Sequence, residues 1–273
     1  MKPEETEGKG RLAVVIGGAS GIGAVTAQVL HDHGWNIAVA DIDEAAAQAS
    51  AARFGGHAVA MNVLEPSSIE AAAEEIEAAH GPVYAMVNFA AIFAPQTPPE
   101  HLPVETWDRI SQVHGRGTYL TNVEFAKRMA AQGCGAIVNI SSIAATRPNH
   151  GHAYVSGKAA INSLTESMAG EWGRSGVRVN AVTPGFVAVP RMVAAIKEGK
   201  RYPFPPHELT ALGRLTEPKE VAEAIAFLLS DRASGITGAN LAVDGGVLAT
   251  SGWIVHGGVP KARPRAGAVK TGE

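Results

Sequence analysis

A glycine-rich turn near the start of the chain constrains its fold more than any other segment. The apolar run 12–16 leads into residues 17–23 (GGASGIG), and apolar residues return at helical spacing at Val25, Val29 and Leu30. A strand, a glycine turn and a helix in this order suit a dinucleotide, because glycines let the backbone approach a pyrophosphate and the helix N-terminus supplies unpaired N–H groups. An ordinary turn explains most glycine-rich stretches, so the interpretation depends on the residues that follow.

An acidic residue follows at the spacing expected for recognition of an adenosine ribose. The next apolar run, 36–40, ends at Asp41, about 20 residues beyond the turn. A carboxylate there accepts hydrogen bonds from both ribose hydroxyls but repels a 2′-phosphate, and no Arg or Lys stands in the turn or directly after Asp41. The alternative is a helix cap, because Asp43 and Glu44 follow where a helix is expected to begin. We favour NAD over NADP.

The length and the order of the segments predict one domain. A chain of 273 residues with 46% hydrophobic residues can bury one substantial core. Apolar runs alternate with helical stretches, which predicts a single-domain α/β fold of the Rossmann type: a doubly wound, seven-stranded parallel sheet with helices on both faces. The expected strands are 12–16, 36–40, 57–62, 83–88, 136–140, 177–182 and 240–243. The expected helices after the first are 68–79, 104–132, 153–174 and 218–230.

Composition excludes several other classes of protein. The net charge is -3 without a basic cluster in the body of the chain, which argues against nucleic acid. The single Cys134 cannot form an intramolecular disulfide and is expected to be a buried thiol. No apolar run approaches a membrane span of about 20 residues, and the first ten residues do not read as a signal peptide, so we expect a cytoplasmic protein. His150 and His152 lack further ligands at a suitable spacing, and we expect no metal.

A tyrosine and a lysine one helical turn apart are a candidate general acid/base pair. Tyr154 and Lys158 occupy positions i and i+4 of an expected helix, and Ser142 lies twelve residues upstream. A lysine ammonium beside a phenol favours the phenolate and lowers the phenol pKa from about 10 toward the range of a general acid/base. By itself the pair is more often an ordinary surface feature of a helix.

Taken together, these motifs resemble the short-chain dehydrogenase/reductase family over roughly residues 10–248. The resemblance rests on the glycine turn, on segments 139–142 (NISS) and 180–185 (NAVTPG), on the Tyr-Lys pair, and on 213–215 and 244–246. It implies that Tyr154 transfers the proton at the substrate oxygen, Ser142 orients that oxygen, and Lys158 assists Tyr154 and holds the nicotinamide ribose. The cofactor contacts it implies, with those argued above, are Gly17, Ser20, Gly21, Ile22, Gly23, Asp41, Asn62, Val63, Phe89, Ala90, Tyr154, Lys158, Pro184, Gly185 and Val187.

Five positions depart from the family pattern. Ile16 replaces a threonine with little expected effect, and Asn62 replaces an aspartate but keeps a carbonyl acceptor for the adenine. Phe89 introduces a ring near the adenosine, and Val189 loses a hydrogen bond to the carboxamide worth about 0.5–1.5 kcal/mol. His114 stands where the family has an asparagine in a proton relay. Its imidazole can sustain that relay as a fourth catalytic group, or it merely packs.

The substrate is expected under a lid formed by residues 186–215. Phe186 and Met192 in this segment, together with Phe93, indicate a hydrophobic secondary alcohol or ketone, and His150 is expected at the mouth of the site. The lid also carries Ile196, Tyr202, Phe204 and a proline-rich stretch. The alternative is that these apolar groups close the core or pack against a second subunit.

The chain is thus divided into a polar arm (1–10), a catalytic domain (11–248) and an extension (249–273). The resemblance implies a homo-oligomer, a tetramer or dimer. The ordinary interpretation of the extension is a frayed basic tail, and the sharper hypothesis is that residues 253–255 (WIV) dock on a neighbouring subunit. The expected function is NAD-dependent interconversion of a small-molecule secondary alcohol and its ketone. The alternative, suggested by Phe89, His114 and Val189, is a catalytically weak NAD-binding sensor or scaffold.

Overall fold

Seven parallel strands form one sheet in the computed structural model, which describes residues 7–93, 97–199 and 205–263. The strands are β1 (Leu12–Ile16), β2 (Asn36–Asp41), β3 (His57–Ala60), β4 (Val83–Asn88), β5 (Gly135–Ile140), β6 (Val177–Pro184) and β7 (Asn240–Val243). Their order is β3-β2-β1-β4-β5-β6-β7, so the direction of winding reverses between β1 and β4. The predicted fold is confirmed, and such a reversal leaves a crevice beyond the carboxyl ends of the strands, where ligands bind.

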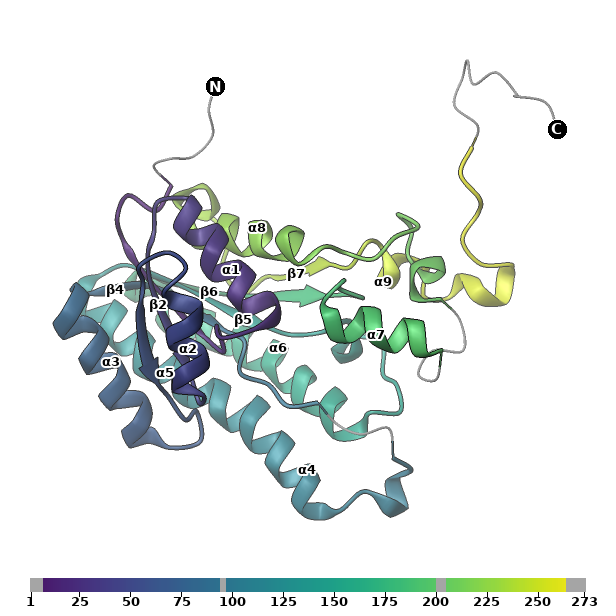
Figure 1. Cartoon of the computed structure of the whole chain (residues 1–273), viewed down its shortest axis with the longest axis horizontal. Helices are drawn as coiled ribbons and strands as arrows, with labels where there is room; N and C mark the ends of the chain where they lie inside the picture. The colour runs from purple at the N-terminus through teal and green to yellow at the C-terminus, as the bar shows by residue number, and fades with distance from the viewer. Residues whose placement is uncertain (1–6, 94–96, 200–204, 264–273) are drawn as a thin grey trace.

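Helices cover both faces of this sheet, as Figure 1 shows. They are α1 (Gly21–Asp32), α2 (Glu44–Ala51), α3 (Pro66–His80), α4 (Val104–Ser111), α5 (Thr118–Gln132), α6 (His152–Trp172), α7 (Pro190–Glu198), α8 (Pro218–Leu229) and the short α9 (Val247–Thr250). Ala13 and Val15 of β1 join a core with α1, α2 and α8. Val14 and Ile16 join the opposite core with α3, α5 and α6. Each central strand is therefore buried on both sides, which explains its unbroken apolar sequence.

The single helix expected over residues 104–132 is divided in the structure. A π-helical segment (Gln112–Gly117) separates α4 from α5 and turns Val113, His114 and Gly117 inward. Gly117 suits this place because a Cβ there would lie 3.0 Å from Cγ2 of Val63. Helix propensity does not register one inserted residue, so the sequence indicated the helix but not its interruption.

The prediction that Cys134 is buried is wrong. The thiol is exposed, in the turn between α5 and β5. Gly133 ends α5 in a left-handed conformation (φ 73°), and Cys134 follows it before the sheet begins. Four strand ends also differ by one or two residues: β2 extends to Asp41, β3 stops at Ala60, β5 begins at Gly135, and β6 extends to Pro184.

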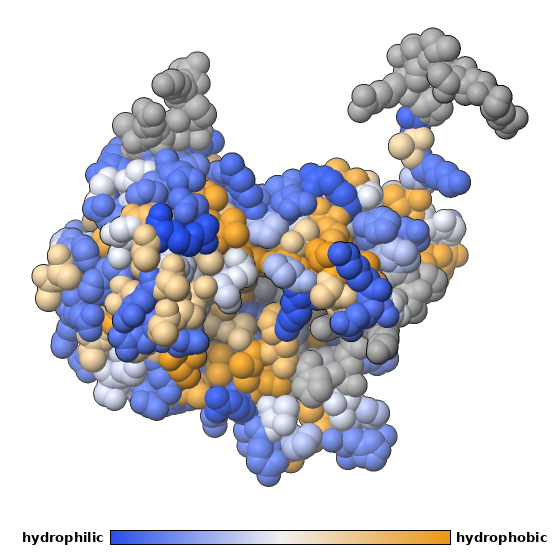
Figure 2. Space-filling view, in the orientation of Figure 1, coloured by the Kyte–Doolittle hydropathy of each residue, from blue (hydrophilic) through white to orange (hydrophobic). Residues whose placement is uncertain are grey.

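The described part of the chain contains no helix long and apolar enough to cross a membrane. Within the same residues no group of three or more His, Cys, Asp or Glu side chains is arranged to hold a metal ion. Figure 2 shows the surface hollowed between the start of α1 and α7. This hollow adjoins the glycine turn that leads from β1 into α1, and it is where the predicted site residues are sought.

Candidate active site

Close backbone packing explains the glycines between β1 and α1. A Cβ on Gly23 would overlap the carbonyl oxygen of Gly17, and one on Gly18 would lie 2.8 Å from the carbonyl oxygen of Val15. Gly17 and Gly21 have positive φ angles of 72° and 56°, which side chains disfavour. Ser20 and Ile22 complete the turn at the N-terminus of α1. A cradle that side chains would fill, ending at a helix N-terminus, fits the pyrophosphate of a dinucleotide.

Asp41 lies against this turn. Its Oδ2 accepts a hydrogen bond of 3.2 Å from the backbone N–H of Ala19. The alternative role, capping α2, belongs to Asp43, whose Oδ1 accepts from Ala46 N–H at 3.0 Å. Asp41 Oδ1 accepts a second backbone hydrogen bond, from Asp43 N–H at 3.2 Å. An adenosine ribose beside the turn would therefore use the lone pairs that these two bonds leave on the carboxylate.

The segment after β4 closes the other side of the turn. A Cβ on Gly17 would lie 3.0 Å from the backbone of Phe89 and Ala90, so these residues face the glycines directly. Asn88 holds this segment: its Nδ2 donates to Thr121 Oγ1 at 3.1 Å, and its Oδ1 accepts from Ala90 N–H at 3.0 Å. Phe89 and Ala90 thus lie where the cofactor was predicted to pass.

Asn62 is engaged in a local turn. Its Oδ1 accepts from Leu64 N–H at 3.1 Å, while its Nδ2 donates to Glu65 Oε1 at 2.8 Å. An adenine contact from its side chain would compete with these bonds. Its neighbour Val63 is buried against the π segment at Gly117.

Lys158 is buried at the carboxyl end of β5, one helical turn after Tyr154 on α6. Its Nζ donates a 2.8 Å hydrogen bond to the carbonyl oxygen of Ile140 and lies 5.8 Å from the centre of the Tyr154 ring. Ser141 Oγ in turn donates to the Lys158 carbonyl oxygen at 3.4 Å. Burial lowers the pKa of Lys158 to about 7.

Ser142 lies two residues beyond Ile140, the last residue of β5. It caps a short 3₁₀ helix, η3 (Ile143–Ala145), and its Oγ accepts from Ala144 N–H at 3.2 Å. Because η3 packs against α6, the serine, tyrosine and lysine share one edge of the sheet. The structure therefore places the three residues at one junction, between the end of β5 and the start of α6.

A buried polar network fixes this edge and was not anticipated from the sequence. Asn122 of α5 donates to Asn139 of β5 at 2.8 Å, and Asn139 donates to Thr165 of α6 at 3.1 Å. All three side chains are buried. Asn139 was noted only as part of the NISS segment. Its role needs the spatial neighbours, and only the placement of polar residues in otherwise apolar elements signals it.

His114 is completely buried beside Tyr154 and Lys158. Its ring lies edge-to-face with that of Tyr154, with centroids 5.3 Å apart, and its Nε2 accepts from Ile92 N–H at 3.2 Å. Burial and then the charge of Lys158 lower the pKa of His114 to about 3, and a smaller opposing contribution from the Ile92 backbone does not offset them. The imidazole is therefore neutral at any pH where an enzyme of this kind would work.

Phe93 covers Tyr154 from the solvent side. The two rings stack with centroids 5.6 Å apart and an interplanar angle of 14°. The guanidinium of Arg191, from α7, lies 3.4 Å from the centre of the Phe93 ring. The loop after β4 and the lid helix thus meet above the tyrosine, and sequence reasoning missed the contribution of Arg191.

The residues predicted to contact the nicotinamide lie at and just after the end of β6. A Cβ on Gly185 would lie 2.7 Å from Cα of Asp244, so only glycine fits between β6 and the segment after β7. Val187 is buried and pairs with Thr216 in a short parallel bridge. Pro184 ends β6, and Val189 precedes α7. This wall is held by backbone packing.

The other residues predicted to contact the substrate lie between β6 and α7, in α7, and in the loop before α6. Phe186 leads from β6 toward α7, and Met192 is half-buried in the first turn of α7. His150 is exposed in the loop before α6. Tyr202 and Phe204, also expected in the lid, lie outside the described residues.

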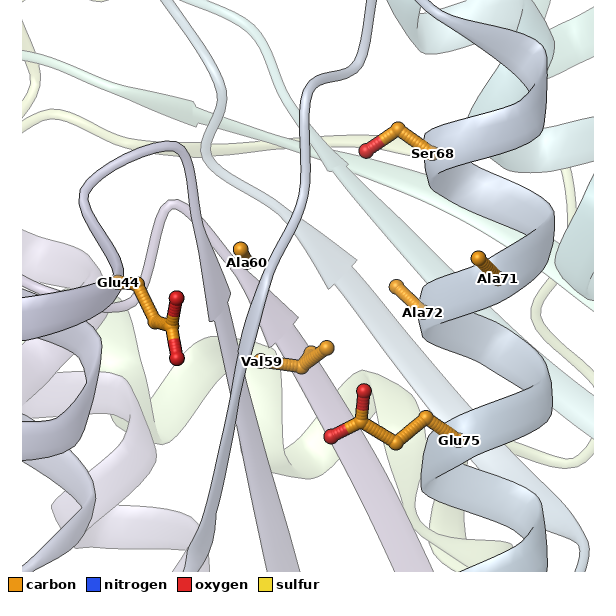
Figure 3. A pocket seen from close by; sticks show the side chains of 7 residues that line it. All are labelled: Glu44, Val59, Ala60, Ser68, Ala71, Ala72 and Glu75. Atoms are coloured by element: carbon orange, nitrogen blue, oxygen red, sulfur yellow. The ribbon is translucent and has the colours of Figure 1, made fainter.

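A separate pocket of about 190 Å³ lies between β3 and α3 (Figure 3). Glu44 and Glu75 line it together with Val59, Ser68 and three alanines. None of the predicted site residues lines it, although Ser68 accepts a 3.0 Å hydrogen bond from Asn62 N–H. Its lining contains neither the glycine turn nor the tyrosine and lysine described above, so it matches neither the predicted cofactor site nor the predicted catalytic site.

Comparison with known proteins identifies relatives of this chain. A family model described as enoyl-(acyl carrier protein) reductase matches residues 17–248. Cis-4-hydroxycyclohexanecarboxylate dehydrogenase of Sinomonas cyclohexanicum is 40% identical over 244 residues, covering 88% of this chain and 97% of that protein. D-threitol dehydrogenase of Mycolicibacterium smegmatis is 37% identical over 243 residues, covering 87% and 92%.

A solved structure from Brucella melitensis 16M, described as a ribose-5-phosphate isomerase, has a TM-score of 0.88 and 42% identity, covering 92% of this chain and 98% of that one. The fold and the glycine turn define a dinucleotide-binding α/β protein. The chain belongs to the short-chain dehydrogenase/reductase family.

Proposed function

We propose that the protein is an NAD-dependent oxidoreductase that interconverts a hydrophobic secondary alcohol and its ketone. The observation that carries this proposal is the junction of β5 and α6. There Lys158 is buried against Ile140 and lies near the face of the Tyr154 ring. Ser142 follows Ile140, the last residue of β5, by two positions. Relatives described as alcohol dehydrogenases support the reaction class.

In this proposal Tyr154 takes the proton from the substrate hydroxyl during oxidation and returns it during reduction. Ser142 Oγ gives up its local bond to Ala144 and donates to the substrate oxygen. The Lys158 ammonium stabilises negative charge on the phenol oxygen and fixes the ribose next to it. The nicotinamide, when bound, supplies or accepts the hydride. The Phe93 ring shields the tyrosine from water.

The preference for NAD rests on Asp41. Its carboxylate already accepts from Ala19 N–H at the turn, so a 2′-phosphate placed there would meet a negative charge. The Asp41 oxygens can instead accept from two ribose hydroxyls.

The substrate class rests on the surroundings of Tyr154. The aromatic face of Phe93 and the nearby Phe186 and Met192 favour an apolar carbon skeleton. One relative is named for a hydroxycyclohexane compound and another for a polyol. Both substrates carry secondary hydroxyls, so we propose this group as the reacting one, with ring-borne alcohols as the first class to test.

We further propose that this cytoplasmic enzyme works as a homo-oligomer, a tetramer or dimer. Trp253, Ile254 and Val255 of the extension are exposed by 48%, 53% and 79%, and Leu241 on the edge strand β7 by 37%. A second copy covering them would remove apolar surface from water. Light scattering of the full chain and of a chain ending at residue 251 tests this. The proposal fails if both are monomeric.

The decisive assay follows absorbance of reduced nicotinamide while NAD or NADP is offered with cyclic, open-chain and polyol secondary alcohols. We expect turnover with NAD on the apolar cyclic members, abolished by Tyr154→Phe while calorimetry shows cofactor binding retained. NAD binding without turnover across the panel would support the sensor or scaffold alternative. A pentose phosphate serves as a further control: its isomerisation without an absorbance change would contradict the proposal.

A further inference from the structure

His114 occupies an enclosed space beside Tyr154. His114 comes from the π segment between α4 and α5, and its ring is enclosed between Ile92 and α6. Its Nε2 accepts a hydrogen bond from Ile92 N–H, so in the neutral ring the proton resides on Nδ1. Nδ1 is buried and has no hydrogen-bond partner among the described residues. Within the described part of the chain, the charged group that acts on this ring is Lys158, which disfavours imidazolium.

Gly157 provides the space for this ring. It lies on α6 between Tyr154 and Lys158 and is buried. A Cβ built on Gly157 would be 2.7 Å from His114 Nδ1 and 2.9 Å from His114 Cβ. Side-chain carbons do not approach that closely, so any larger residue at 157 forces the imidazole or the helix to move.

The displaced ring would not move alone. His114 lies edge-to-face with Tyr154 at a centroid distance of 5.3 Å and an angle of 82°, and Phe93 stacks on the Tyr154 ring. Tyr154 is thus held by an imidazole and a phenyl ring, and the imidazole is held by Gly157. A shift of about 1 Å at a reacting group can cost about a hundredfold in rate.

We propose that His114 is a positioning residue for Tyr154 and that Gly157 is its obligatory partner. The imidazole acts by its shape and its fixed neutral state, and it does not carry the proton. This inference rests on the proposed function, in which Tyr154 is the acid/base. It also explains how the chain tolerates a histidine in the π segment at a site that must keep Tyr154 and Lys158 in register.

The test is a double-mutant cycle at positions 114 and 157. Gly157→Ala is the sharpest single change, because alanine favours a helix over glycine and would stabilise α6 if space allowed. Gly170→Ala on the same helix is the matched control, since nothing lies within 4 Å of a Cβ there. The shorter His114→Asn side chain should relieve the conflict in the double variant.

We expect Gly157→Ala to lower kcat by about tenfold or more and to shift the pH profile of kcat, while Gly170→Ala does neither. In the His114→Asn background, Gly157→Ala should cost less than about twofold. The proposal is overturned if Gly157→Ala costs the same factor in both backgrounds. It is also overturned if the change alters only the melting temperature.

A second readout separates this inference from the proposed function. The titration of Tyr154 is recorded as the ultraviolet difference between each variant and the same variant carrying Tyr154→Phe. We expect Gly157→Ala to move the midpoint and His114→Asn to suppress that movement. If the wild type turns over no alcohol but the midpoint moves, the function fails and the positioning stands. An unmoved midpoint overturns the positioning whatever the activity.

Discussion

Helices α1 and α7 border the same hollow, yet they are built in different ways. Six residues of α1 are buried, and the helix packs into the core with α8. No residue of α7 is buried, and this helix is held by its connection to β6 and by the contact of Arg191 with Phe93. Figures 1 and 2 show α1 within the body and α7 along the rim of the hollow.

We propose that the two helices serve two kinds of ligand, with the cofactor at α1 and the substrate at α7. A dinucleotide keeps the same backbone in every enzyme of this fold, so its cradle can be made of main chain and glycines with fixed geometry. A substrate differs from one enzyme to the next, so side chains on a helix without buried residues, such as α7, would suit its wall. We expect changes at the α1 side to act on binding of any nicotinamide cofactor, and changes at the α7 side to act on particular substrates.

The largest effect should come from Gly23→Ala in α1. The added methyl would overlap the carbonyl oxygen of Gly17, and the turn has no flexible side chain that could yield. We expect loss of about 1–3 kcal/mol of unfolding free energy and a fall of about a hundredfold or more in NAD affinity. Urea denaturation and calorimetry measure the two, with Gly170→Ala as control. Unchanged NAD affinity would show that the turn is not the cradle.

Asp41→Asn should have the next largest effect. It keeps a hydrogen-bond acceptor for Ala19 N–H but removes the charge that faces a 2′-phosphate. We expect the ratio of NADP to NAD in kcat/KM to rise by about tenfold to a hundredfold, since about 1.4 kcal/mol corresponds to each factor of ten. Steady-state kinetics with both cofactors measure the ratio. If the wild type already uses NADP as well as NAD, the role assigned to Asp41 is wrong.

The α1 side was also the part that the sequence predicted well. Buried parallel strands appear as continuous apolar runs, and a glycine turn between a strand and a helix has few other uses, so local patterns sufficed. What could not be predicted arises from contacts between distant segments. The fit of His114 against Gly157 joins residues 43 positions apart in the chain. The contact of Arg191 with Phe93 likewise needs the folded structure, and the π segment inserts a single residue that no helical period registers.

Phe93→Ala tests the α7 side with a smaller effect. The change removes the ring that stacks on Tyr154 and the surface on which Arg191 rests. We expect KM for an apolar cyclic alcohol to rise about five- to tenfold, corresponding to partial burial of an aromatic ring, with NAD affinity unchanged. The KM of the Phe93→Leu variant should lie between those of the wild type and Phe93→Ala. An equal loss for polyols and apolar alcohols would show that Phe93 does not select the substrate.

Lys158→Met acts on the stability of the fold, and the sign of that effect distinguishes a functional lysine from a structural one. Burial depresses the pKa of Lys158 to about 7, below its value of about 10.4 in the unfolded chain. The folded protein therefore bears the full cost of the buried ammonium below about pH 7. This cost declines as the pH rises from about 7 to about 10.4 and is absent above.

Methionine fills a similar volume without a charge, so we expect the cofactor-free Lys158→Met variant to be more stable than the wild type by about 1–2 kcal/mol at pH 6. The gain should shrink at pH 9.5, because the wild-type lysine is then neutral in the folded state. Urea denaturation at the two pH values measures it, with the exposed Lys219→Met as control. A site that becomes more stable on losing its lysine keeps that lysine for catalysis, as the proposed function requires. A loss of stability at both pH values would instead assign Lys158 to holding β5 and α6 together through Ile140.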